Sequence, residues 1–243
     1  MKNIKISYEY DGSDFFGFQR QPGFRTVQGE IEKALKIILK EKINLVSAGR
    51  TDRGVHARHQ VSNFFTDNKI PVERMKRVLN ATLPSDIVIL DVEEVAEDFN
   101  SRFSAIFRTY EYDLTWEKSP FTSRYCTYYP EPIDEEKFLE ILKPLVGVHD
   151  FANFRLSDCG SNTTVREIYE VRCYKKENSI LRVYIKGNAF LKSQIRIIIG
   201  TALGVYSGKL ERTYLQKMLE NPHIEYLKFV AEPQGLHLSK IGY

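Results

Sequence analysis

The chain has 243 residues and a formal net charge of +3, with 42% hydrophobic and 28% charged residues. This balance is typical of a globular protein with a sizeable core and excludes wholesale disorder. No apolar run approaches the roughly 20 residues that cross a bilayer, and the first residues enter a strand pattern rather than a signal peptide, so we expect a soluble, cytoplasmic protein.

Residues 2–95 alternate between strand and helix patterns. The first strand, 2–10, ends at a turn beginning with Asp11, and Thr26 can cap a helix that runs to about residue 40. The other predicted elements of this half are strands at 43–48, 55–65 and 86–95 and a helix at 72–79. The order β-α-β-β-α-β is that of the split βαβ unit in ferredoxin-like and RNA-recognition folds.

The second half of the chain repeats this plan loosely. Its predicted elements are strands at 108–116, 165–176, 180–186 and 227–230 and helices at 134–146, 191–206 and 212–220, with a hairpin turn around 177–179. The tetrapeptide YEYD occurs at 8–11 and again at 110–113, which suggests a duplication. We therefore expect an α+β protein with two ferredoxin-like or RRM-like halves, 1–104 and 105–243, whose sheets pack together or run on continuously.

A polar turn in the first half holds the first candidate for chemistry. Asp52 lies between Arg50 and Arg53 in the sequence RTDRG. An Asp and a Gly are also what a structural turn requires, so Asp52 could simply bond a backbone amide. Flanking cations would instead favour an ionised, nucleophilic carboxylate. The next strand presents His56 and Arg58 on one face, where they could line a groove.

Charge and metal-ligand patterns bear on the possible partners. Five arginines at 20, 25, 50, 53 and 58 form a local cationic stretch that could engage phosphates, although a solvated face is the plainer interpretation. His56 and His59 are three residues apart on a strand and point to opposite faces, so joint zinc binding is disfavoured. The cysteines at 126, 159 and 173 fit neither a disulfide framework nor a metal knuckle and are expected to be reduced.

Several motifs in order resemble one family, the TruA-type tRNA pseudouridine synthases. The resemblance runs from Tyr8 to Tyr243 and is strongest at AGRTDRGVHA (48–57), which is similar to the family's catalytic motif. The supporting blocks are YDG (10–12), FQRQP (18–22), TVQG (26–29), FNSRFSA (99–105), RTYEY (108–112), HDF (149–151) with Phe154, and EPQGL (232–236).

The resemblance implies a role for each matching residue. Asp52 corresponds to the nucleophile, Tyr110 to the tyrosine that stacks on the target base, and Arg196 to the arginine that pairs with the catalytic carboxylate. Arg58 corresponds to a basic residue that admits or flips the nucleotide. The remaining expected substrate contacts are Arg50, Arg53, His56 and Leu236.

The family also implies an architecture and partners. These are an extended antiparallel sheet shared by two halves, helices on one face, an active cleft between the halves, a homodimer, and the anticodon stem-loop of tRNA as substrate. Isomerising uridine involves no net redox change, so we expect neither cofactor nor metal.

One segment departs from the family pattern. FLKSQIR (190–196) has Lys192-Ser193-Gln194 where a His-Met-containing stretch is usual, while Arg196 is kept. This departure bears on which RNA is the substrate more than on which reaction is catalysed. A divergent paralogue acting on ribosomal RNA therefore remains an alternative, as does a non-catalytic RNA-binding protein, although the latter lacks an RNP-type aromatic block.

Overall fold

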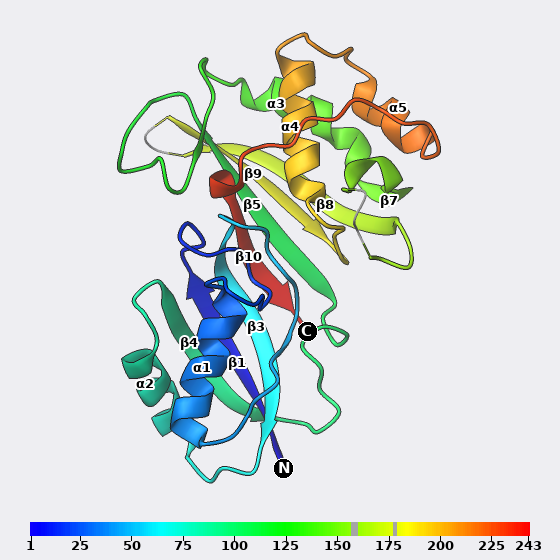
Figure 1. Ribbon diagram of the computed structural model, residues 1–243. Coiled ribbons are helices and arrows are strands. Elements are labelled where there is room, and N and C mark those ends of the chain that lie inside the picture. The colour runs from blue at the N-terminus through cyan, green and yellow to red at the C-terminus, as the bar shows by residue number, and fades with distance from the viewer. Residues whose placement is uncertain (157–159, 177–178) are drawn as a thin grey trace. The chain divides into compact units, whose positions relative to one another are not determined.

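The computed structural model describes residues 1–156, 160–176 and 179–243 (Figure 1). It divides into two compact units, one formed by 1–106 with 237–243 and the other by 107–236. The last seven residues of the chain therefore belong to the first unit. No helix among the described residues is long and apolar enough to cross a membrane.

The first unit is a mainly antiparallel sheet with two helices. Its elements are β1 (Lys2–Tyr10), α1 (Val27–Leu39), β2 (Val46–Ser47), β3 (His56–Thr66), α2 (Val72–Thr82), β4 (Ile87–Val95) and β10 (Leu236–Gly242). The strand order is β4-β1-β3-β10, with β2 paired to β3. β1 runs antiparallel to both β3 and β4, whereas β10 runs parallel to β3. The predicted element order of this half is confirmed.

Local sequence explains the helices of this unit. The Thr26 hydroxyl caps α1 by accepting a hydrogen bond from the Gly29 amide at 3.3 Å, as the sequence predicted. Ile31 and Leu35, one helical turn apart, are fully buried on the same face of α1. In α2 the buried residues Met75 and Leu79 have the same spacing. The predicted strand at 43–48 is reduced to two residues, 46–47.

The second unit is a sheet with its helices packed on one another. Its elements are β5 (Phe107–Thr115), β6 (Thr127–Tyr128), α3 (Glu135–Leu142), β7 (Gly147–Asp150), β8 (Val165–Lys176), β9 (Ile180–Gly187), α4 (Gln194–Tyr206) and α5 (Tyr214–Glu220). The order is β5-β9-β8-β7, with β6 beside β5. α3 packs on β8 and α4, and α4 packs on α5 (Figure 1). The strands of the predicted hairpin are confirmed, while its turn residues 177–178 lie outside the described residues.

Two predicted elements of the second unit were wrong or differ in extent. Residues 227–230 do not form a strand, because this segment lies against α4: Gly200 approaches so closely that a Cβ there would be 2.4 Å from the Phe229 carbonyl oxygen. The last strand is β10 instead. The predicted helix 134–146 ends at Leu142, and a 3-10 turn containing Pro144 follows, since proline removes a helical hydrogen bond.

Candidate active site

The turn that holds Asp52 is fixed by the loop between β1 and α1, residues 11–26. The Asp52 carbonyl accepts the Val55 amide at 3.2 Å, and Gly54 completes the turn with φ of +77°. On the other side, Thr51 accepts the Phe18 amide at 3.1 Å through its carbonyl, and its hydroxyl bonds the Tyr10 hydroxyl at 2.8 Å. Asp52 itself is half-buried, in a turn whose backbone is anchored on both sides.

Two glycines make this close packing possible. A Cβ on Gly12 would lie 2.0 Å from the Val55 carbonyl oxygen. Gly17, with φ of +83°, brings the loop within 3.2 Å of the Thr51 carbonyl oxygen, measured from the position of a Cβ. The loop and the Asp52 turn therefore form one packed piece.

We expect Gly12→Ala to disrupt this piece. The added methyl must push the loop or the turn away, because Val55 offers backbone rather than a movable side chain. Overpacking of this kind costs about 1–3 kcal/mol. Urea denaturation would show the loss, whereas Gly160→Ala, at a position with nothing within 4 Å of the added Cβ, serves as the control. Wild-type stability in Gly12→Ala would contradict the packing described here.

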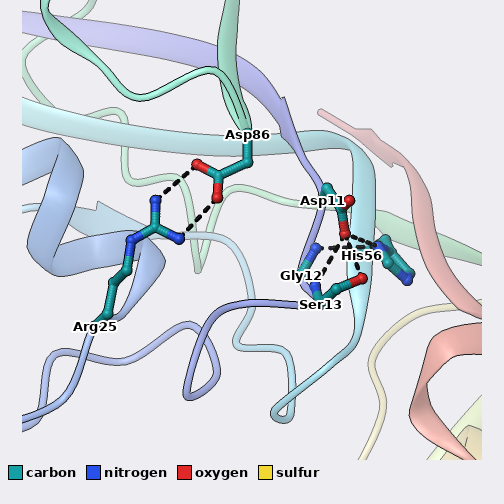
Figure 2. A network of polar contacts seen from close by, with 6 residues as sticks. All are labelled: Asp11, Gly12, Ser13, Arg25, His56 and Asp86. Carbon is teal, nitrogen blue, oxygen red and sulfur yellow. Dashed lines mark hydrogen bonds and ion pairs between the residues drawn. The ribbon is translucent and has the colours of Figure 1, made fainter. Parts of the chain in front are cut away.

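His56 lies beside the Asp11–Gly12–Ser13 segment of the same loop and contacts it (Figure 2). Its Nδ1 accepts the Gly12 amide at 3.0 Å, and Asp11 Oδ1 lies 3.2 Å from the same nitrogen. Nδ1 thus accepts a hydrogen bond from the loop backbone and also lies close to the Asp11 carboxylate, so the ring contacts two consecutive residues of the loop. The ring stacks on His237 at 4.9 Å between centroids. His56 is only 2% exposed, so it positions the loop and does not face a groove.

The expected basic residues of this unit differ from His56 in exposure. Arg50, Arg53 and Arg58 are all exposed. The guanidinium of Arg53 lies 5.1 Å from the centroid of the Phe16 ring. Arg50 and Arg53 directly flank Thr51 and Asp52 in the chain, and the positive charge of such exposed arginines suits a polyanion.

In the second unit, Tyr110 and Tyr112 follow one another on the same face of β5. Tyr110 is half-buried, and the Phe190 ring meets it edge-on at 5.3 Å and 86°. Tyr112 is buried and donates to the Glu232 carbonyl at 2.7 Å. Burial raises the pKa of Tyr112, while the nearby Arg196 charge acts in the opposite sense. Tyr110 is thus the more accessible of the two aromatic rings.

Arg196 is tied to the segment that follows α5. Its Nε donates to the Ala231 carbonyl at 2.8 Å, and the Ala231 amide donates to the Arg196 carbonyl at 2.9 Å. Arg196 is half-buried near the N-terminus of an otherwise apolar helix. Its pairing with Asp52 stays a prediction. Leu236, at the start of β10, is buried.

The segment that departs from the family forms a tight turn before α4. Ser193 adopts φ of +57°, and Gln194 Oε1 accepts the Leu191 amide at 2.8 Å. The Gln194 Nε2 atom is buried and has no hydrogen-bond partner within the described part of the chain.

A buried charge cluster on β5 and β9 was not predicted. Arg182 donates to both carboxylate oxygens of Asp113 at 2.6 Å and approaches Glu111 at 2.7 Å. Burial lowers the pKa of Arg182, but the hydrogen bonds and charges of the two carboxylates raise it overall. Only the register that pairs Asp113 with Arg182 reveals this cluster.

Metal-binding groups are not gathered in the described parts of the chain. No three His, Cys, Asp or Glu side chains among residues 1–156, 160–176 and 179–243 are placed to hold an ion. Cys126 and Cys173 are both buried, and burial raises the pKa of the Cys173 thiol to about 12. Cys159 lies outside the described residues.

Comparison with known proteins identifies the family. The model of a family described as tRNA pseudouridine synthase matches residues 6–104 and 141–243. The tRNA pseudouridine synthase A of Caldicellulosiruptor bescii is 38% identical, with 100% of both chains covered. The protein of the same name from Geobacillus sp. is 40% identical, with 100% of this chain and 98% of the other covered. The chain therefore belongs to the tRNA pseudouridine synthase family, and it is an isomerase.

One further relative and one solved structure are also similar to this chain, the structure at much lower sequence identity. The tRNA pseudouridine synthase A 2 of Clostridium perfringens is 37% identical over 100% of both chains. A crystal structure of a Cbf5-Nop10-Gar1 complex is 11% identical with a TM-score of 0.40, covering 97% of this chain and 57% of that one.

Proposed function

We propose that this enzyme isomerises uridine in the anticodon stem-loop of tRNA, with Asp52 as the nucleophile. The observation that carries the proposal is the Asp52 turn: Asp52 is half-buried, the backbone of the turn is anchored on both sides, and exposed arginines flank Asp52 in the chain. It occurs in a chain whose relatives along its whole length are tRNA pseudouridine synthases.

The reaction exchanges one bond between base and sugar for another. The N1–C1′ bond breaks, a C5–C1′ bond forms, the C5 hydrogen leaves as a proton and N1 gains a proton. No electrons are gained or lost, so we propose that the chain needs neither cofactor nor metal. The Asp52 carboxylate would act on the sugar C1′, on the base, or on the 2′ proton to form a glycal.

The other site residues would bind and present the nucleotide. Tyr110 offers an aromatic face for the extruded base, a contact typically worth about 1–3 kcal/mol, which helps offset the few kcal/mol needed to unstack that base. Arg58 would contact the RNA backbone, Arg196 would pair with Asp52, and Leu236 would support the base pocket. Support comes from the family model, which matches residues of both units.

The architecture implied by the family belongs to this proposal. Two ferredoxin-like halves sharing one sheet, with the cleft between them, would bring Asp52, Tyr110 and Arg196 to one uridine. A cytoplasmic homodimer is part of the same proposal. Sedimentation equilibrium at micromolar concentration tests the dimer, and a monomer mass would remove it.

A tritium-release assay tests the function. A tRNA anticodon stem-loop labelled with tritium at uridine C5 should lose label to water when the enzyme is added, and a chelator should not reduce the rate. A ribosomal RNA fragment is the matched alternative substrate, because the buried Gln194 amide marks a change from the family pattern. Release from the ribosomal fragment alone would assign a different RNA, and binding without release from either would indicate a non-catalytic RNA-binding protein.

A further inference from the structure

An exposed stack of side chains lies beside the Asp52 turn. The Arg53 guanidinium lies 5.1 Å from the Phe16 ring centroid, and the Phe16 and Phe24 rings stack at 4.0 Å with an interplanar angle of 18°. Phe24, the outermost layer, is 52% exposed. The two rings are nearly parallel, like neighbouring bases in a stack. The exposed Phe24 ring could therefore stack on one further flat ring.

The loop holds this stack in place. The Phe16 amide donates to the Arg25 carbonyl at 2.8 Å, and the Phe24 amide donates to the Gln21 carbonyl at 3.3 Å. Arg25 binds both carboxylate oxygens of Asp86 at 2.7 and 2.9 Å (Figure 2) and lies 4.1 Å from the Phe15 ring centroid. Arg25 is therefore an anchor, and the aromatic surface is formed before any ligand binds.

The stack is also part of the packed piece that carries Asp52. Arg53 is the next residue in the chain, and the Gly17 backbone that follows Phe16 approaches the Arg53 amide nitrogen to 3.3 Å from the position of a Cβ. A ligand resting on Phe24 would therefore lie at a fixed position relative to Asp52.

We propose that the exposed face of Phe24 stacks on an unpaired base of the RNA substrate, one that neighbours the target uridine. The occupant is inferred from charge and shape together, because exposed Arg50 and Arg53 complement phosphates while the ring accepts any base. Arg53, which is exposed and contacts the Phe16 ring, supplies positive charge beside the stack. This inference rests on the proposed function for the identity of the RNA.

A binding experiment with matched variants tests whether Phe24 is a stacking platform for a base. For an anticodon stem-loop RNA we expect Phe24→Ala to raise Kd about tenfold, while Phe24→Trp keeps the wild-type Kd and shows indole fluorescence quenching on binding. Phe121→Ala removes a ring that is 91% exposed and lies outside the residues that the family model matches, so its Kd should stay at the wild-type value. A Kd for Phe24→Ala within twofold of wild type would overturn the proposal.

Abasic nucleotides identify the stacking partner. When single abasic sites are placed along the loop of the RNA, one of them should weaken wild-type binding and abolish the difference between wild type and Phe24→Ala. Equal losses for both proteins at every position would rule out a stacked base. If Phe24→Ala instead changed only the sedimentation mass, the ring would contact a second copy of the chain, and the proposal would fail.

The platform and the proposed function can fail separately. Tritium release by wild type with no Kd change in Phe24→Ala overturns the platform alone. Coupling of Phe24 to one base without tritium release keeps the platform and removes the proposed function.

Discussion

Asp52→Asn should reduce tritium release from uridine-labelled RNA by a factor on the order of 10⁴ or more, as expected when a catalytic carboxylate is replaced by a neutral isostere. The amide has nearly the same shape, so the turn held by Thr51 and Val55 should persist. Its RNA affinity should stay close to wild type, because phosphate contacts and stacking do not require this carboxylate.

The matched control for this variant is Asp91→Asn. Asp91 is an exposed aspartate on β4 in the same unit, so its replacement should leave both turnover and stability unchanged. Single-turnover release with enzyme in excess separates the chemical step from binding. Turnover of Asp52→Asn equal to that of Asp91→Asn would show that another group performs the reaction.

Arg182→Leu should cause the largest loss of stability, about 3–5 kcal/mol in the free energy of unfolding. Arg182 is 8% exposed and Asp113 is 3% exposed, so removing the guanidinium takes away the two short hydrogen bonds to Asp113 and leaves that buried carboxylate with the more distant Lys176 ammonium, at 3.9 Å. At about 2–4 °C per kcal/mol for a chain of this size, Tm would fall by roughly 6–20 °C. Urea denaturation followed by circular dichroism measures the change.

Two further variants make this test specific. Arg172→Leu removes an arginine that pairs with Glu170 on the surface of the same sheet, and the urea midpoint should not move, because exposed ion pairs contribute little. Replacing Glu111 and Asp113 by Gln and Asn together with Arg182→Leu should recover part of the loss by removing the uncompensated charges. Equal effects of Arg172→Leu and Arg182→Leu would contradict the account of the buried cluster.

Elements with strong local signals could be predicted from the sequence. The Thr26 cap, the apolar spacing in α1 and the alternation in β1 are local properties, and the structure has each of them. β10 has no such signal, because its pairing in the first unit joins His237 with His56, far away in the chain. Residues 227–230 have a strand-like composition, yet their position is set by Gly200 of α4, which no local pattern reveals.

The candidate site shows the same division. The Asp52 motif and its flanking arginines are visible in the sequence, as is the resemblance that assigns their roles. The close packing at Gly12 and Gly17 is not visible in the sequence, because it depends on the approach of two loops that are separate in the chain. His56 lies on the polar face of a predicted strand but is buried, and its ring stacks on His237, its partner on the neighbouring strand β10.

Sequencing of pseudouridines in RNA from a strain that lacks this gene tests the central claim most directly. We expect the deletion to remove pseudouridine from tRNA anticodon stem-loops, wild-type enzyme to restore it, and Asp52→Asn, expressed at the same level, to restore none. Unchanged tRNA pseudouridine in the deletion strain, or full restoration by Asp52→Asn, would contradict the account.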